Sequence, residues 1–599
     1  MSLTPVLRDA TFRWIADDPS AATRAELQGV LARAMGGDAA ALADLEDRMA
    51  GPLTFGTAGL RGPVRAGTNG MNVATVVRTT AGLAAWLRTS GAGSSASGLG
   101  ASGLNSGGTG SGTGASGPGT FGSGSGGLVA SGSGAPGTSS GGTGASASGV
   151  SGSGASGVVF VGRDARHGSE EFAVAAAEVM AAAGFDVRML PGPLPTPVLA
   201  FLVRQHGAVA GIQITASHNP PADNGYKLYL AGGSQIVPPS DGEIEQAIEA
   251  VPAAVSVARA STYSVVPDAD VDAYLERVAS LPSGTARSLK IALTPMHGVG
   301  GQFAVEALRR AGFTDVHVVR SQAVPDPDFP TVAFPNPEEP GASDELLALA
   351  ESVDADLAIA LDPDADRCAL GVRDGSAWRM LRGDETGVLL GSLVLSTVES
   401  ADPLVATTIV SSSLLRSIAA AHGARYAETL TGFKWLARAG EGLVFAYEEA
   451  LGNCVDPSFV ADKDGISAAV VAADLAAGLK SSGRTLLDAL DQLALDHGLH
   501  LTDQVSLRYT DLSLIGATMA RLRAEPPAEF TSEDLLPGAD VLRWTAEGVR
   551  VIVRPSGTEP KLKAYLEVVE PVTDGLESAR AAAKTRLAEL RERVTALVS

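Results

Sequence analysis

The chain has 599 residues, 45 % hydrophobic and 19 % charged, a balance that suits a globular protein with several domains of roughly 100–200 residues each. Lys and Arg number 45 against 67 Asp and Glu, and the net charge of −22 argues against a nucleic acid or an anionic membrane as partner. Only two cysteines are present and no uncharged apolar stretch reaches about 18 residues, so neither a disulfide framework nor a membrane span is indicated, and we expect a cytoplasmic protein.

The first predicted domain covers residues 1–262. Its pattern predicts a helix at 72–88, a strand at 158–161, a helix at 170–183 and a strand at 186–190. Between the first helix and the first strand, residues 91–157 contain 26 glycines in 67 residues and no charged residue. This composition offers little apolar surface for burial, so we predict a disordered Gly/Ser-rich insertion inside the domain.

The same order of strand, turn, helix and strand recurs in the next two predicted domains, 263–375 and 376–497, as in α/β sheets. The predicted elements are 290–293, 302–311 and 316–319 in the second domain, and 404–410, 414–421 and 426–429 in the third. The fourth domain, 498–599, differs, with strands at 548–553 and 561–568 and a closing helix at 573–598. We therefore predict three similar mixed α/β sheet domains and a distinct C-terminal α+β domain.

The first polar loop, Thr215-Ala216-Ser217-His218-Asn219-Pro220, lies between apolar strands at 208–214 and 226–230. Hydroxyl and imidazole groups at the end of a strand can supply a nucleophile or a carrier of a phosphoryl group. An ordinary turn is an equally good interpretation of this loop by itself, because Ser, Asn and Pro all favour turns.

The second polar loop places Asp362, Asp364 and Asp366 at alternate positions directly after the apolar strand 357–361. Their oxygens can converge on one hard cation, which favours Mg²⁺ with an anionic ligand completing its shell. A calcium EF-hand is excluded, because Arg367 stands where that loop needs Gly and Arg373 stands where it needs Glu.

Two further loops carry charged groups. Glu448 and Glu449 follow the apolar run 443–446 and could accept hydrogen bonds from sugar hydroxyls, although a charged helix start is the simpler reading of this loop alone. Residues 554–560 read Arg-Pro-Ser-Gly-Thr-Glu-Pro, and their guanidinium, hydroxyl and backbone amide groups suit a phosphate. Five of the eight lysines, Lys227, Lys434, Lys463, Lys561 and Lys563, lie in or beside these four loops.

No Gly-Lys dipeptide occurs, so a Walker A phosphate loop is absent. Taken together, the four loops resemble the α-D-phosphohexomutase superfamily, and the resemblance covers almost the whole chain except 91–157. Segments 55–62, 223–227 and 334–338 are also similar, and the Glu-Glu-Ala-Leu-Gly form resembles the phosphoglucomutase-2-like and actinobacterial branch, which is mixed in substrate. One departure is Gly70, where relatives often have Arg or Lys. The resemblance implies four domains around a central cleft, each contributing one loop.

The resemblance also implies roles for the loop residues. Ser217 would carry a phosphoryl group, and Asp362, Asp364, Asp366 and that phosphate would bind Mg²⁺. Lys227, Arg61 and His218 would stabilise the transferred group or exchange protons. The residues implied in substrate binding are Arg367, Lys434, Glu448, Glu449, Arg554, Ser556, Gly557, Thr558 and Lys561.

The implied activity is that of an isomerase, a phosphosugar mutase that interconverts hexose 1-phosphates and 6-phosphates of glucose, mannose or both. The reaction would pass through phosphoserine and a sugar 1,6-bisphosphate, which also serves as activator. One alternative is a phosphopentomutase acting on ribose or deoxyribose phosphates. Another is an inactive relative that binds phosphosugars as a sensor, against which the intact Ser217, the three aspartates and Arg554 argue. Hydrolysis of phosphoserine is a possible side reaction.

Overall fold

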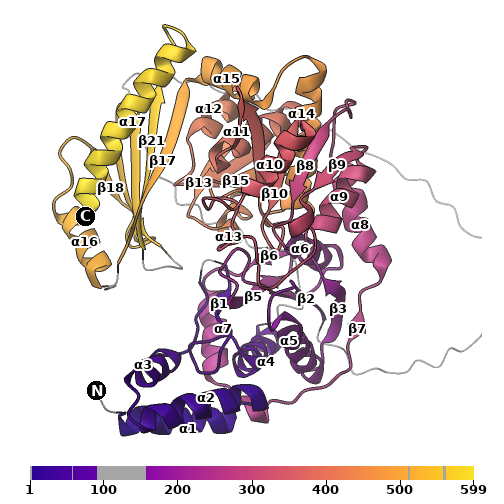
Figure 1. The fold of residues 1–599 in the computed structure, drawn as a ribbon, viewed down its shortest axis with the longest axis vertical. Coiled ribbons are helices and arrows are strands. Elements are labelled where there is room, and N and C mark those ends of the chain that lie inside the picture. Colours follow the sequence, from indigo (N-terminus) through magenta and orange to yellow (C-terminus); the bar gives the residue numbers. More distant parts are fainter. Residues whose placement is uncertain (1–2, 57, 91–156, 510, 512, 557–560) are drawn as a thin grey trace, which may run out of the picture. The chain divides into compact units, whose positions relative to one another are not determined.

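The computed structural model describes residues 3–599 apart from 57, 91–156, 510, 512 and 557–560. The predicted insertion at 91–157 therefore lies outside the described residues except for Gly157. In the described part of the chain, the strands form four sheets, each flanked by helices (Figure 1). No helix in this part is long and apolar enough to cross a membrane.

The first sheet has the strand order β1-β5-β4-β2-β3-β7, with β6 beside β5. Its strands are β1 (Leu60–Pro63), β2 (Val158–Arg163), β3 (Asp186–Pro193), β4 (Ala210–Ile214), β5 (Asp223–Leu230), β6 (Ser234–Gln235) and β7 (Ser264–Val265). The helices before and among them are α1 (Pro5–Asp17), α2 (Ala21–Met35), α3 (Ala39–Arg48), α4 (Val73–Thr89), α5 (Ser169–Ala182), α6 (Thr196–Gln205) and α7 (Ser240–Glu249). Helices α1 to α3 and strand β1 are absent from the sequence-based prediction.

The central strand β2 is buried on both faces, which explains its uninterrupted apolar sequence. Val159 and Val161 pack in one core cluster with α4 and α5, whereas Phe160 faces the opposite cluster with α6. Strand β5 begins at Asp223, earlier than predicted, because its first residues pair with β1 in the register Pro63 to Asp223. Because β1 and β5 are far apart in the sequence, no local sequence pattern predicts this pairing.

The next two sheets follow the predicted order of elements. The second has the order β12-β11-β10-β8-β9 and the third β14-β13-β15-β16. The second sheet contains β8 (Lys290–Thr294), β9 (Asp315–Val318), β10 (Leu357–Leu361), β11 (Cys368–Asp374) and β12 (Ala377–Met380), with α8 (Asp268–Ala279), α9 (Gly301–Arg310) and α10 (Asp344–Val353). The third contains β13 (Leu404–Thr408), β14 (Arg425–Thr429), β15 (Leu443–Glu448) and β16 (Gly452–Cys454), with α11 (Gly383–Thr397), α12 (Leu414–Ala421), α13 (Phe433–Leu436), α14 (Gly465–Ser481) and α15 (Leu486–His497).

The C-terminal sheet has the order β17-β21-β20-β19-β18, and all its pairs are antiparallel. Its elements are β17 (Leu499–Arg508), α16 (Ser513–Ala524), β18 (Thr531–Asp534), β19 (Leu542–Ala546), β20 (Val549–Pro555), β21 (Lys561–Glu570) and α17 (Leu576–Val598). Leu590 and Val594 of α17 pack on Val551 and Leu566 of the sheet, and Figure 1 shows this helix along it in yellow. The predicted fold class, three mixed α/β sheet domains and a distinct α+β domain, is confirmed.

Three of the four predicted loops follow the carboxyl end of a strand that has a parallel neighbour. Strand β4 is parallel to β2, β10 to β8, and β15 to β13. The loop after β4 contains Ser217, the loop after β10 contains the three aspartates, and the loop after β15 contains Glu449. Open α/β sheets bind ligands at this edge, so the fold places the polar loops where a site is expected.

Candidate functional site

The loop after β4 holds Ser217 in a constrained conformation. Ser217 has a φ of +52°, a value that is uncommon for a residue with a side chain. Its backbone N–H donates to Thr215 Oγ1 at 2.9 Å, while the N–H of Thr215 donates to the carbonyl of Gly225 in β5 at 3.1 Å. The buried hydroxyl of Ser217 donates to Asp362 Oδ2 at 2.7 Å. The structure therefore joins the first and second predicted loops.

The loop after β10 gathers three carboxylates. Asp362, Asp364 and Asp366 are fully buried, and one oxygen from each lies within 4.8 Å of the others. Asp364 Oδ1 and Asp366 Oδ1 have no hydrogen-bond partner, and buried polar atoms in this state need an explanation. Carboxylate oxygens are the ligands that hard divalent cations prefer, so the residues present fit a metal ion such as Mg²⁺.

Lys227 of β5 balances part of this negative charge. Its ammonium donates to Asp364 Oδ2 and to Asp366 Oδ2, each at 2.6 Å, and the side chain is buried. Burial disfavours the charge on Lys227, but Asp364 and Asp366 outweigh this effect and raise its pKa. The lysine is therefore a cation at neutral pH, directly beside the candidate metal ligands.

The carboxylates of this cluster titrate differently from one another. Burial and the charges of Asp364 and Asp366 hold the pKa of Asp362 well above its usual range. For Asp366, burial acts in the same direction, but Lys227 and Lys463 outweigh it and lower the pKa. Asp362 is the carboxyl in the cluster that accepts the hydrogen bond from the Ser217 hydroxyl.

His218 and Arg61 lie next to Ser217. The Nδ1 atom of His218 is 3.2 Å from Ser217 Oγ, and burial together with Arg367 and Arg61 holds the pKa of His218 well below its usual range. The imidazole is therefore neutral near pH 7 and can accept a proton. Arg61 of β1 donates from Nη1 to Asn219 Oδ1 at 2.9 Å, and its buried Nε has no hydrogen-bond partner.

Gly225 allows β1 and β5 to approach the Ser217 loop closely. A Cβ atom at this position would lie 2.5 Å from the carbonyl oxygen of Thr215 and 2.6 Å from that of Leu60. A side chain there would displace backbone rather than a flexible neighbour. The glycine in the segment 223–227 therefore brings Arg61 and Lys227 to the same site.

The two glutamates of the third loop contact different partners. Glu448 Oε1 is 3.8 Å from Arg367 Nη2, and Arg367 also donates to the carbonyl of Ala450 at 2.9 Å. Glu449 instead accepts hydrogen bonds from Thr408 Oγ1 at 3.1 Å and Ser411 Oγ at 3.0 Å. Arg367 thus connects the aspartate loop with the glutamate loop through Glu448, while Glu449 is held by hydroxyl groups.

Other predicted residues are not brought together with this cluster. In the described structure, Lys434 lies in α13 with its ammonium 5.9 Å from the centre of the Trp435 ring, and it makes no ion pair with the loop carboxylates. Arg554 is the residue before the last one of β20, and the Ser556 N–H donates to the carbonyl of Lys561 at 2.8 Å. Gly557 and Thr558 lie outside the described residues. Arg554 forms a side-chain hydrogen bond with Tyr565, which lines the same cavity as Glu449 of the third loop.

Arg166 is a residue of the site that the sequence analysis missed. From the loop after β2, its buried guanidinium donates to the carbonyls of Ser217 and Asn219, each at 2.6 Å, and to those of Pro220 at 2.8 Å and Asp223 at 3.1 Å. Asp164 lies 3.5 Å from its Nε. The sequence carries a signal for Arg166, because charged residues directly follow a buried strand there. The same signal identified the loop after β10.

Thr196, at the start of α6, is a second missed residue. Its backbone N–H donates to the carbonyl of Asp364 at 3.0 Å, and its hydroxyl donates to the carboxylate of the same residue. Thr196 is fully buried. The N-terminus of α6 therefore holds the central aspartate of the cluster, a contact made across 168 residues of sequence.

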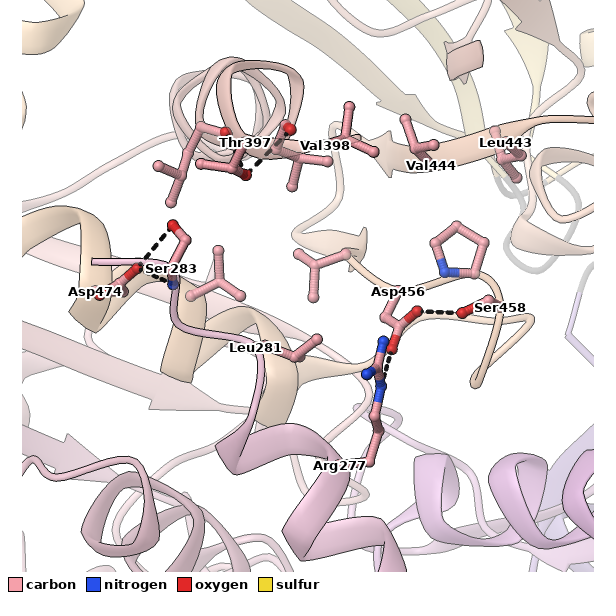
Figure 2. Close-up of a pocket in the computed structure, with 15 residues that line it drawn as sticks. Arg277, Leu281, Ser283, Thr397, Val398, Leu443, Val444, Asp456, Ser458 and Asp474 are labelled. Carbon is pink, nitrogen blue, oxygen red and sulfur yellow. Dashed lines mark hydrogen bonds and ion pairs between the residues drawn. The ribbon is translucent and has the colours of Figure 1, made fainter. Parts of the chain in front are cut away.

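Two cavities lie outside the aspartate cluster. One, of about 490 Å³, is lined among others by Glu338, Asp384, Glu449 and Tyr565, so it borders the glutamate loop. The other, of about 280 Å³, is drawn in Figure 2 and is lined by none of the predicted site residues. Its charged groups are already paired, with Arg277 Nε 2.7 Å from Asp456 and Asp474 accepting from the Ser283 N–H at 2.9 Å.

Comparisons with known proteins find similarity to one family along most of the chain. Residues 143–254, 272–375 and 382–494 match phosphoglucomutase/phosphomannomutase alpha/beta/alpha domains I, II and III, and residues 507–576 match the C-terminal domain of that family. A probable phosphomannomutase of Haemophilus influenzae is 43 % identical over 68 % of this chain and 87 % of its own length. A phosphopentomutase of Homo sapiens is 35 % identical over 67 % of this chain and 75 % of its own length.

A solved structure shows the same fold. The crystal structure of a putative phosphomannomutase from Thermus thermophilus superposes with a TM-score of 0.62 at 22 % identity, covering 90 % of this chain and 99 % of that one. The agreement of fold at this low identity means that the order of sheets and helices is shared even where most side chains differ.

Proposed function

The chain belongs to the phosphoglucomutase/phosphomannomutase family and is an isomerase that transfers a phosphoryl group within a sugar phosphate, and from this premise we propose its substrates and mechanism. The proposed reaction interconverts hexose 1-phosphates and 6-phosphates of glucose, mannose or both. The observation that carries the proposal is the contact of 2.7 Å between Ser217 Oγ and Asp362 Oδ2, at the edge of three buried carboxylates.

In the proposed mechanism Ser217 carries the phosphoryl group. The sugar hydroxyl attacks phosphorus and the Ser217 Oγ–P bond breaks, so the sugar gains a second phosphate and becomes a bisphosphate. After the bisphosphate turns around, Ser217 Oγ attacks its other phosphorus and the product leaves with one phosphate. His218, neutral near pH 7, accepts the proton of the attacking hydroxyl and returns it to the leaving oxygen. Lys227 and Arg61 supply fixed positive charge to the transferred group.

A divalent cation, proposed to be Mg²⁺, would be held by Asp362, Asp364 and Asp366 and by an oxygen of the phosphate on Ser217. When bound, it would withdraw negative charge from the phosphoryl group. The chain's own contribution is to hold these ligands in place, through Lys227 and Thr196 at Asp364 and through Ser217 at Asp362.

The remaining residues are proposed to bind the part of the substrate that does not react. Glu448 and Glu449 would accept hydrogen bonds from sugar hydroxyls, with Glu448 oriented by Arg367 and Glu449 by Thr408 and Ser411. The distal phosphate would be held by the fourth loop. The residues assigned to substrate binding are Arg367, Lys434, Glu448, Glu449, Arg554, Ser556, Gly557, Thr558 and Lys561.

The domain boundaries at 262/263, 375/376 and 497/498 remain predictions. A cytoplasmic location also remains a prediction, which the two free, buried cysteines support.

A phosphopentomutase is the second candidate, supported by the 35 % identity to the human enzyme of that name. The decisive experiment is ³¹P NMR of the purified protein with Mg²⁺ and a trace of sugar bisphosphate, with glucose 1-phosphate, mannose 1-phosphate and ribose 1-phosphate in separate samples. We expect both hexose phosphates to be converted faster than ribose phosphate. Faster conversion of ribose would favour the phosphopentomutase, and no conversion of any sugar would favour the inactive sensor.

Replacing Asp364 with Asn is expected to weaken metal binding by at least about tenfold. The amide keeps the size of the side chain but removes the charge that attracts the cation. The measurement is the Mg²⁺ concentration that gives half-maximal mutase activity, together with direct titration by Mn²⁺. Asp356→Asn is the matched control, because Asp356 contacts Lys480 at 2.6 Å and lies at the opposite end of β10 from the aspartate cluster. An unchanged metal dependence in Asp364→Asn would contradict the assigned site.

A further inference from the structure

Asp366 is contacted by two lysines that come from different parts of the fold. Lys227 of β5 reaches its Oδ2 atom at 2.6 Å, and Lys463, two residues before α14, reaches the same atom at 3.3 Å. All three side chains are buried. Lys227 already has a place in the proposed mechanism, whereas Lys463 has none.

The side chain of Lys463 is held in this position by packing. A Cβ atom at Gly452, directly after the glutamate loop, would lie 2.4 Å from Lys463 Cδ, so the lysine occupies the space that any larger residue would need. Its ammonium is 5.4 Å from the centre of the Phe433 ring and 3.6 Å from Asp462 Oδ1. Two carboxylates, those of Asp366 and Asp462, therefore lie within ion-pair distance of this ammonium and stabilise its positive charge.

With Lys463 included, three cationic side chains lie against the aspartate cluster. Asp362, Asp364 and Asp366 carry three negative charges when ionised. Lys227 and Lys463 contact these carboxylates, and Arg367 Nε lies 3.8 Å from Asp366 Oδ1 while its backbone N–H donates to Asp362 Oδ1 at 3.1 Å. A divalent cation held by these carboxylates would therefore lie close to three buried cationic side chains, of which Lys463 contacts Asp366 directly.

We propose that Lys463 is a positioning residue that holds Asp366 from the side of the glutamate loop and, through its charge, lowers the affinity of the aspartate cluster for divalent cations. This inference rests on the proposed metal site. Like charges in a buried site repel strongly because little water screens them. Lys463 thus holds the carboxylate of Asp366 in place in the absence of metal and weakens the binding of a divalent cation.

The test measures metal binding directly rather than activity. Free Mn²⁺ is followed by electron paramagnetic resonance during titration of the full-length protein, with Ser217 shown by intact mass to be unphosphorylated. We expect Lys463→Met to bind Mn²⁺ roughly tenfold more tightly than the wild type, a change equal to about 1.4 kcal/mol. Lys463→Arg keeps the charge and is expected to bind Mn²⁺ within about twofold of the wild type.

Lys480→Met is the matched control. Lys480 also contacts an aspartate, Asp356, at 2.6 Å, but on an exposed surface outside the cluster, so its removal should leave Mn²⁺ binding unchanged. Lys463→Gln replaces Lys463→Met should the latter fail to fold, judged by circular dichroism. Unchanged or weaker Mn²⁺ binding in the folded neutral variants would overturn the inference while leaving the metal site intact. No saturable binding by the wild type would overturn the metal site and the inference with it.

Discussion

Ser217→Ala is expected to lower mutase activity by at least about 10³-fold, because it removes the oxygen that carries the phosphoryl group. The nearest other hydroxyl on the loop, that of Thr215, already accepts the N–H of Ser217 and is held by the backbone. Activity is measured from the conversion of glucose 1-phosphate. Incorporation of phosphate from labelled sugar bisphosphate, followed by mass spectrometry, reports the phosphorylated residue itself.

The fold should survive this substitution. Ser217→Ala removes one hydrogen bond to Asp362 and no core side chain, so the melting temperature should fall by only a few degrees. Ser458→Ala is the matched control, because the Ser458 hydroxyl donates to Asp456 at 2.6 Å outside the cluster and its loss should leave turnover unchanged. Full turnover by a folded Ser217→Ala protein, or labelling at another residue, would remove Ser217 from the mechanism.

Arg166→Ala is expected to destabilise the protein by about 3–5 kcal/mol, the usual effect of removing one partner of a buried charged pair. The substitution leaves Asp164 without its cation and removes a donor from the carbonyls of Ser217, Asn219, Pro220 and Asp223, of which that of Pro220 keeps the N–H of Asp223. Thermal unfolding followed by circular dichroism measures the loss. Activity should fall more than stability alone explains, since the loop that holds Ser217 at positive φ loses its anchor.

The substitution Arg166→Lys separates the effect of the positive charge at this position from the effect of the planar guanidinium and its several donors. A lysine keeps the charge beside Asp164 but cannot donate to four carbonyls from one planar group, so stability should recover in part while kcat stays low. Arg309→Ala is the control, because Arg309 is an exposed arginine that pairs with Glu306 on the surface of α9, and we expect its melting temperature to match the wild type. A wild-type kcat in Arg166→Lys would contradict a positioning role that depends on the fork of the guanidinium.

Several features of the site could be predicted from sequence because their causes are local. A buried strand followed at once by Asp362, Asp364 and Asp366 needs only hydrophobic runs and turn residues to be recognised. The same holds for Ser217 after β4 and for Glu448 and Glu449 around the end of β15. The four-domain fold class was also predictable, since strand and helix periodicities repeat in the same order in three domains.

Other features depend on contacts between distant segments. Lys463 reaches Asp366 across nearly a hundred residues, and Thr196 reaches Asp364 across 168. The different partners of Glu448 and Glu449 depend on where folding brings Arg367 and Ser411. No local pattern encodes such pairs, because each is decided by how separate sheets and helices pack.

Local sequence patterns are enough to predict the fold class, the strand ends that carry polar loops and the residue types in those loops, because hydrophobic periodicity and turn chemistry act over a few residues. Three other features arise from contacts between distant segments: the pairing of β1 with β5 brings Arg61 and Lys227 to one site, Arg166 anchors the Ser217 loop, and two lysines contact Asp366. Strand register and helix packing set these contacts, since a buried charge is stable only where folding brings its partner.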